Sequence, residues 1–318
     1  MQELREKNNI AFSVIIPHKN IPDLLMRCVN SIPKRDDLEI IIIDDNSSGD
    51  IVNFENFPFK NDDSRNLKII FDKSDLGAGH ARNLGLEVAQ GKFLIFADAD
   101  DFFLFTLNNI LDKYKNSDYD LIFCNACSLD CEFYTNADRA KYVQEDISMY
   151  RNSPQKAEFY LKYSCSVVWS KIIKRDLAIK NLIRFDELPC GNDIKFSYLT
   201  GFYAKSWDVC EIAIYCVTER KDSLTRTETQ DRKIVRLKIL VEKIKFFVAH
   251  NIECDKFSPI YSFYKYYKNS NNDKNFYNEG MNILKSLNYT EKEIKLHLCV
   301  ACFQRLKSKL KYLIKKII

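Results

Sequence analysis

Short apolar runs alternate with helical patterns through the first third of the chain, and this alternation restricts the fold more than any other feature of the sequence. The apolar runs cover residues 12–16, 38–43, 67–71 and 92–97. The segments with helical periodicity between them are 23–31 and 81–89. Apolar strands separated by helices are typical of βαβ units, in which helices cover both faces of a parallel sheet. We therefore expect an α/β fold with a mostly parallel sheet flanked by helices.

Polar clusters follow three of these runs. They are Pro17-His18-Lys19-Asn20, Asp44-Asp45-Asn46-Ser47 and Asp98-Ala99-Asp100-Asp101. Ligands of such sheets bind beyond the carboxyl ends of the strands. Because each cluster follows a strand of the same sheet, we expect the three clusters to form one site.

The acidic cluster at residues 98–101 indicates a bound cation. Carboxylates held together without a basic neighbour repel one another, and a cation relieves that repulsion. Carboxylates select hard ions, and Mg²⁺ typically joins one or two of them to the phosphates of a substrate. The cluster therefore predicts Mn²⁺ or Mg²⁺ at a phosphate site. The structural alternative is a turn that caps a helix over residues 104–114.

Composition excludes several other classes of protein. The polar N-terminus and the lack of an apolar run of about 20 residues predict a cytoplasmic chain without a signal peptide or a spanning helix. The 11 cysteines lie mostly in apolar runs, which indicates reduced thiols. The pairs Cys124/Cys127 and Cys299/Cys302 lack the glycine turn of a zinc knuckle. No nucleic-acid partner is expected, because aromatic platforms do not accompany the basic residues.

A glycine-rich segment at residues 77–85 precedes the fourth apolar run. Its glycines admit close backbone approach, and Arg82 could pair with a diphosphate. The dinucleotide fingerprint G-x-G-x-x-G does not fit, because Arg82 occupies the third glycine position and no glycine follows the first strand.

Four blocks together resemble family 2 glycosyltransferases with the GT-A (Rossmann-like) fold. The sequence FSVIIPHKN (12–20) resembles the opening strand and its P-x-Y-N turn, with Lys19 where the family often has an aromatic residue. EIIIIDDNS (39–47) resembles the V-D-D-x-S segment, and LGAGHARNLG (76–85) resembles the G-x-x-x-A-R-N-x-G helix start. GKFLIFADADD (91–101) resembles the strand that carries the D-x-D motif.

The resemblance implies a UDP-sugar donor site. Asp44 or Asp45, with Asp45 favoured, would contact the base, and Asp98 would contact the ribose. Asp100 would coordinate the metal that bridges the diphosphate, and Arg82 would steady the same diphosphate. The other residues implied to line the nucleotide-sugar site are Pro17, His18, Asn20, Gly77 and Ala99.

A second set of residues belongs to the acceptor side. GNDIKF (191–196) resembles the family's E-D-x-x-F motif, with Asn192 in place of the glutamate. The resemblance makes Asp193 the general base and Asn192 a neighbour of the sugar pocket, with Glu187 as the second candidate for the base. The structural alternative for Asp193 is an acid stabilised by a helix dipole. Trp169 is expected either to face a sugar ring or to lie in the core.

Downstream of these residues, the segment 215–225 resembles the family's strand and R-x-x-S-x-T loop. It places Arg220 and Ser223 at the border of the nucleotide site, with ordinary turn chemistry as the alternative.

The domain organisation follows from a change in pattern near residue 230. We expect a GT-A domain at 1–230, with a donor half at about 11–128 and an acceptor half at about 129–230, and a helical appendage at 231–318. Residues 301–318 contain six basic residues and no acid, so the rest of a chain with net charge +4 is slightly acidic. This basic amphipathic segment fits either an anionic membrane surface or an apolar face of the domain.

The resemblance implies an inverting, metal-dependent enzyme. It would add one sugar from a UDP-sugar to a bacterial capsule, lipooligosaccharide or similar glycan, on a glycan or lipid-linked acceptor. Such an enzyme would be cytoplasmic, or peripheral on the cytoplasmic face of the inner membrane through residues 301–318. Two alternatives stay open: an inactive nucleotide-binding scaffold at the membrane, and a nucleotidyltransferase. The sequence does not indicate the sugar, the linkage, the acceptor or the oligomeric state.

Overall fold

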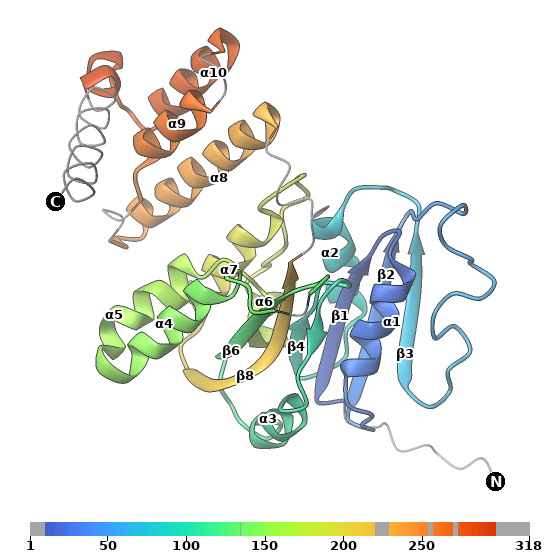
Figure 1. Ribbon diagram of the computed structural model, residues 1–318. Coiled ribbons are helices and arrows are strands. Elements are labelled where there is room, and N and C mark those ends of the chain that lie inside the picture. Colours follow the sequence, from blue (N-terminus) through green and yellow to red (C-terminus); the bar gives the residue numbers. More distant parts are fainter. Residues whose placement is uncertain (1–9, 134, 220–228, 254–256, 270–272, 297–318) are drawn as a thin grey trace, which may run out of the picture. The chain divides into compact units, whose positions relative to one another are not determined.

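The computed structural model describes residues 10–133, 135–219, 229–253, 257–269 and 273–296 (Figure 1). The chain divides into two compact units, Met1–Ser223 and Leu224–Ile318. The residues described in the first unit form a sheet with helices, and those of the second unit are helical. The division of the first unit into donor and acceptor halves stays a prediction.

The first unit is built on a sheet whose described part has eight strands in the order β3-β2-β1-β4-β7-β6-β8-β5. The strands are β1 (Phe12–His18), β2 (Leu38–Asp45), β3 (Asn66–Asp72), β4 (Phe93–Phe96), β5 (Phe102–Phe103), β6 (Leu121–Asp130), β7 (Lys171–Lys174) and β8 (Trp207–Glu219). Strands β1 to β4 pair in parallel, as do β6 and β8. Strand β7 lies antiparallel between β4 and β6, and β5 lies antiparallel to β8. The expected α/β class is confirmed, with a mixed second half of the sheet.

Helices flank this sheet. They are α1 (Pro22–Ser31), α2 (Ala78–Val88), α3 (Leu107–Tyr114), α4 (Lys141–Asn152), α5 (Pro154–Phe159), α6 (Arg175–Lys180), α7 (Asn192–Tyr203) and the π-helical turn η1 (Tyr160–Ser164). Helix α2 lies against β1 and β2, whereas α4 lies against β6 and β8 (Figure 1). A Cβ at Gly85 would come within 2.4 Å of Ile15 and 2.9 Å of Ile43, so glycine lets α2 approach these strands closely.

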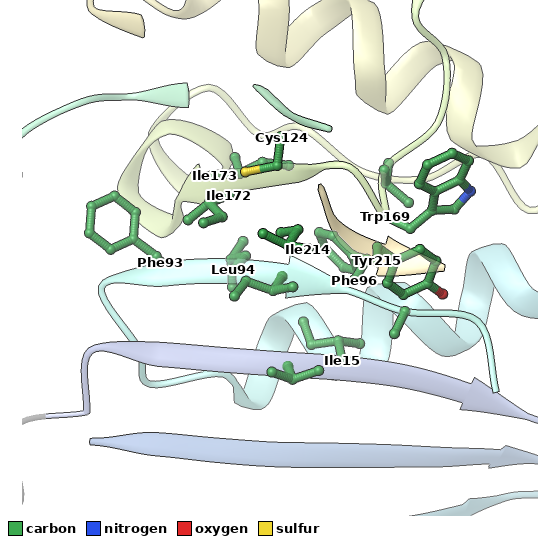
Figure 2. Close-up of a cluster of buried hydrophobic side chains, with 14 of the residues drawn as sticks. Ile15, Phe93, Leu94, Phe96, Cys124, Trp169, Ile172, Ile173, Ile214 and Tyr215 are labelled. Carbon is green, nitrogen blue, oxygen red and sulfur yellow. The ribbon is translucent and has the colours of Figure 1, made fainter. Parts of the chain in front are cut away.

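The core of the first unit lies between the central strands and the helices. Strands β1, β2 and β4 are buried along their full lengths, as the continuous apolar runs predict. Figure 2 shows Leu94 of β4 close to Ile172 and Ile173 of β7, and Leu94 is in register with Ile173. Each such side chain contributes about 1.5–3 kcal/mol by leaving water. This burial fixes the carboxyl ends of β1, β2 and β4, where the polar clusters begin.

The second unit packs three described helices around its own small core. They are α8 (Gln230–Ala249), α9 (Pro259–Lys268) and α10 (Lys274–Lys285). Thr229, Ser258 and Asp273 cap them through side-chain oxygens that accept backbone N–H groups. No helix among the described residues has the length and apolar character needed to cross a membrane. The predicted basic helix at 301–318 lies outside the described residues, so its membrane contact stays a prediction.

Candidate active site

Residues of β8 form hydrogen bonds with the acidic cluster that follows β4. Asp101 is 2% exposed; its carboxylate accepts hydrogen bonds from the Thr218 N–H at 2.7 Å and from the Tyr215 hydroxyl at 3.0 Å. The Tyr215 hydroxyl in turn accepts the N–H of Asp98 at 2.9 Å. Burial, together with the charges of Asp100 and Asp98, raises the pKa of Asp101 well above its usual value. Asp101 therefore anchors the cluster rather than facing a ligand.

Asp98 and Asp100 are the more accessible acids of the cluster. The Asp98 side chain is 34% exposed and Asp100 is half-buried. The main-chain carbonyl of Asp100 accepts the Thr218 hydroxyl at 2.6 Å and a guanidinium N–H of Arg27 from α1. Sequence reasoning missed both Arg27 and Thr218, because nothing in their local sequence marks them as partners of residues so far along the chain.

Trp169 lies in the core beneath this cluster. It is 6% exposed and stacks on Tyr215, with ring centroids 5.5 Å apart and planes 12° apart. Figure 2 shows the two rings side by side. The structure thus places Trp169 at the core position given as the alternative to a sugar-binding surface, because its ring face is covered by Tyr215.

The β1 and β2 turns are tied to each other. His18 donates from Nδ1 to Asp44 Oδ2 at 2.8 Å; its Nε2 accepts the N–H of Ile21, so the proton resides on Nδ1. Asp44 also accepts the N–H and the hydroxyl of Ser47. Burial opposes ionisation of Asp44, but these hydrogen bonds outweigh it and keep its pKa below the usual value. Both His18 and Asp44 are buried and hold the turns together.

Asp45 and Asn20 complete this corner of the site. Asp45 is 4% exposed and accepts the N–H of Gly77, the residue that precedes α2 with φ at +88°. Asn20, also left-handed at φ +58°, accepts the N–H of Ser48 and donates its own N–H to the Ser47 hydroxyl. Pro17, next to His18, is the β1 residue in register with Ile43. The structure therefore joins the turns after β1 and β2 and the residue before α2 into one corner of the site.

Arg82 connects the acidic cluster to the acceptor side. One guanidinium nitrogen donates to Asp98 Oδ1 at 2.5 Å and the other donates to Asn192 Oδ1 at 2.9 Å. The guanidinium lies over the Phe185 ring, 5.5 Å from its centroid. Its Nε–H is buried and has no acceptor among the described residues. Arg82 thus places the donor acids beside the residue that precedes Asp193.

Asp193 lies in the first turn of α7, after Gly191, which adopts a left-handed φ of +66°. Burial raises the pKa of Asp193, and the nearby positive charges of Arg82 and Lys171 only partly oppose this. Lys171 is fully buried, and its ammonium donates to the Cys165 carbonyl at 2.7 Å. A carboxylate with a raised pKa is a better proton acceptor than a carboxylate with the usual pKa.

The loop between α6 and α7, residues 181–191, is held by α2. Asn83 exchanges two hydrogen bonds with the backbone of Phe185, at 2.9 and 3.0 Å. Glu187 accepts from His80 at 2.9 Å and from Asn83 at 3.2 Å, and the hydrogen bond from His80 lowers the pKa of Glu187. This carboxylate is therefore occupied, which leaves Asp193 as the better candidate for a base. Sequence reasoning missed this use of α2, since the partners lie more than 100 residues apart.

The donor acids fit a cation that is shared with a phosphate. Among the residues that the structure describes, no three His, Cys, Asp or Glu side chains gather closely enough to form a cage of protein ligands alone. Mg²⁺ usually binds one or two carboxylates together with substrate phosphates. Asp100, which is half-buried beside Asp101, supplies one such carboxylate, whereas Asp98 is paired with Arg82. Arg220 and Ser223 lie outside the described residues, so their positions stay predictions.

Comparison with known proteins places this geometry in a family. Residues 13–181, slightly more than half of the chain, match the family described as Glycosyl transferase family 2. An uncharacterized glycosyltransferase of Escherichia coli, YibD, is 28% identical over 70% of this chain and 65% of its own length. The Campylobacter jejuni protein named GalNAc(5)-diNAcBac-PP-undecaprenol beta-1,3-glucosyltransferase is 35% identical over 38% of this chain and 39% of its own. The chain thus spans less than two thirds of these relatives.

Solved structures agree in fold. Staphylococcus aureus TarS 1–349 in complex with UDP-GlcNAc superposes with a TM-score of 0.58 at 19% identity, over 81% of this chain and 71% of that one. The mannosyltransferase PcManGT of Pyrobaculum calidifontis, in complex with GDP-Man and Mn²⁺, gives 0.53 at 15% identity, over 97% and 87%. The chain therefore belongs to glycosyl transferase family 2 and has the GT-A fold.

Proposed function

We propose that this chain is an inverting, metal-dependent glycosyltransferase that moves one sugar from a UDP-sugar to a hydroxyl group of a bacterial cell-surface glycan. The observation that carries the proposal is the Arg82 bridge, which joins Asp98 of the donor side to Asn192, next to the raised-pKa carboxylate of Asp193. The guanidinium of Arg82 thus lies between an acid of the proposed donor site and the residue next to the half-buried proposed base. Family membership supports the sugar-transfer chemistry.

The role of each donor-site residue follows from its place in the loops at residues 17–20, 44–47 and 98–101. Asp45, held by the Gly77 N–H, contacts the uracil base, while buried Asp44 and His18 fix the turn beneath it. Asp98 contacts the ribose. The Nε–H of Arg82 is buried without an acceptor among the described residues, and the guanidinium beside Asp98 supplies positive charge for the diphosphate. The UDP-GlcNAc complex of TarS, a protein of the same fold, supports UDP as the nucleotide.

Asp193 performs the proton transfer. Its carboxylate takes the proton of the acceptor hydroxyl as that oxygen attacks the anomeric carbon, and the bond between this carbon and the UDP oxygen breaks. Attack opposite the leaving group inverts the configuration of the sugar. A divalent cation, when bound at Asp100, supplies charge neutralisation for the departing diphosphate. Arg82, fixed by Asp98 and Asn192, adds a second positive charge without reorganisation.

The acceptor proposed is a glycan or a lipid-linked saccharide. The name of the Campylobacter relative describes an undecaprenol-linked acceptor, and this supports the class for a chain with 35% identity over part of its length. The sugar and the linkage are open to the screen described next.

Purified protein supplied with a panel of UDP-sugars and Mn²⁺ tests the proposal. We expect release of UDP rather than pyrophosphate; pyrophosphate would instead identify a nucleotidyltransferase. Asp100→Ala and a chelator should each abolish UDP release. Asp193→Asn should abolish transfer while isothermal titration still detects UDP binding. Binding of UDP without turnover by the wild-type protein, for every sugar and acceptor tried, would favour the inactive scaffold. A matched control is Glu211→Gln, which removes an exposed ion pair with Arg151.

A further inference from the structure

His80 lies at the junction of three segments around the proposed site. Its Nδ1 contacts Glu187 Oε1 of the α6–α7 loop at 2.9 Å, and its Nε2 lies 3.6 Å from Asp72 Oδ2 at the end of β3. The imidazole side chain is 21% exposed, so solvent protons reach it. One ring on α2 thus faces a carboxylate of the donor half and a carboxylate of the loop that leads to Asp193.

The α6–α7 loop has further attachments to α2. Asn83 also donates to Glu187 at 3.2 Å, the Arg82 guanidinium lies over the Phe185 ring, and Arg184 lies 3.8 Å from Glu87. Asn83 holds Phe185, and Gly79 allows the Asp186 carbonyl to approach so closely that a Cβ there would lie 2.2 Å from it. The loop is followed by Asn192, the first residue of α7, whose main-chain carbonyl accepts the N–H of Asp186. Because Asp193 follows directly, any displacement of the loop displaces the proposed base.

We propose that His80 and Glu187 form a protonation-dependent latch that fastens the α6–α7 loop to α2 and so positions Asp193 for proton transfer. The proposal rests on the proposed function for the role of Asp193. His80 is a positioning residue: it acts on the reaction through the loop and does not touch the substrate.

The charge state of the latch follows from its neighbours. The hydrogen bond to Glu187 raises the pKa of His80 above its usual 6.5, and the charges of Asp72 and Asp45 add to this effect against partial burial. Glu187 has a pKa lowered from 4.5, chiefly by the same hydrogen bond. The charged form of the pair therefore exists above the lowered pKa of Glu187, and it is lost as pH rises through the raised pKa of His80. The latch is expected to be closed in weak acid and to loosen toward alkaline pH.

Nuclear magnetic resonance titration of the histidines measures the latch directly. The chain has only four histidines, and His80→Gln assigns the signal. We expect Glu187→Gln to lower the pKa of His80 toward 6.5 and to speed hydrogen exchange at the Phe185 and Asp186 amides. The matched control is Asp186→Asn in the same loop, whose carboxylate contacts Lys195 at 3.2 Å instead. An unchanged His80 pKa in Glu187→Gln, or an equal change in Asp186→Asn, would overturn the latch.

Kinetics test whether the latch positions Asp193. We expect kcat of His80→Gln and Glu187→Gln to fall by about 10-fold to 100-fold, with UDP affinity unchanged, because the base shifts while the donor corner stays in place. The double variant should lose no more than either single one, since the two residues act as a pair. The decline of wild-type kcat as pH rises through the His80 pKa should be absent in His80→Gln.

The kinetic outcomes separate this proposal from the proposed function. A much larger loss in Glu187→Gln than in His80→Gln would make Glu187 the base and overturn the positioning role. Faster hydrogen exchange with unchanged kcat would show that the pair is only a structural contact, and this too would refute the positioning role. If the wild-type protein transfers no sugar, the proposed function fails, whereas the titration and exchange experiments still decide whether the latch exists.

Discussion

Replacing Gly79 with alanine tests how closely α2 must approach the α6–α7 loop. The new Cβ would lie 2.2 Å from the Asp186 carbonyl oxygen and 3.1 Å from Asn192 Cβ. Ordinary contacts begin near 3.4 Å, so the loop must move by about 1.2 Å to accommodate the methyl group. The obstructing oxygen belongs to the backbone and cannot rotate away as a flexible side chain would.

The expected loss of stability and of activity follows from that displacement. Overpacking of this kind costs about 1–3 kcal/mol of unfolding free energy, and the helix propensity of alanine offsets less than about 1 kcal/mol of it. A shift of about 1 Å close to the reacting groups can lower the rate by about 100-fold. We therefore expect Gly79→Ala to unfold at lower urea concentration and to lose most of its kcat.

Urea denaturation, monitored by tryptophan fluorescence, measures the change in the free energy of unfolding. Both tryptophans of the chain, Trp169 and Trp207, belong to the first unit, so their signal reports on the unit that contains the site. The control is Gly49→Ala, where a Cβ would meet no atom within 4 Å. Equal stability and equal kcat for the Gly79 and Gly49 variants would refute the argument that these segments are in tight contact.

Three further predictions concern the groups that hold the site together. Tyr215→Phe should lower the free energy of unfolding, measured by urea denaturation, by about 1–3 kcal/mol, because Asp101 loses a buried donor and the Asp98 N–H loses its acceptor. The control, Tyr203→Phe, changes a more exposed side chain and should leave stability unchanged. Equal effects of the two substitutions would contradict this prediction. Arg82→Lys should lower kcat by about 100-fold, because an ammonium group lacks the planar fork of donors that reaches Asp98 and Asn192 together. A change in kcat of less than about twofold would show that catalysis does not need the Arg82 bridge. Wild-type kcat should fall as pH drops through the raised pKa of Asp193, because the base must be ionised to accept a proton. A pH-rate profile that stays flat down to pH 3.8, the usual pKa of an aspartate, would exclude Asp193 as the base.

The local sequence of the first unit was sufficient to predict strands β1 to β4 and the edge where polar residues gather. Strands β1, β2 and β4 are encoded by consecutive apolar residues, whose burial on both faces requires no knowledge of distant partners. The polar clusters follow these strands directly, so parallel pairing brings their loops to one edge of the sheet. Family motifs within the same segments added the GT-A fold, which the comparisons confirm.

Only the tertiary structure decided what each polar side chain at that edge does. Asp44 and Asp45 are adjacent in sequence, yet Asp44 is bound by His18 while Asp45 accepts the Gly77 N–H. Likewise Asp101 is bound by Thr218 of β8, although its local sequence resembles that of Asp100. These partners lie 26 to 117 residues away, and a carboxylate's burial and pKa depend on which donors reach it in space. The same holds for the α6–α7 loop, whose attachment to α2 follows from packing between segments far apart in the chain rather than from any pattern within either one.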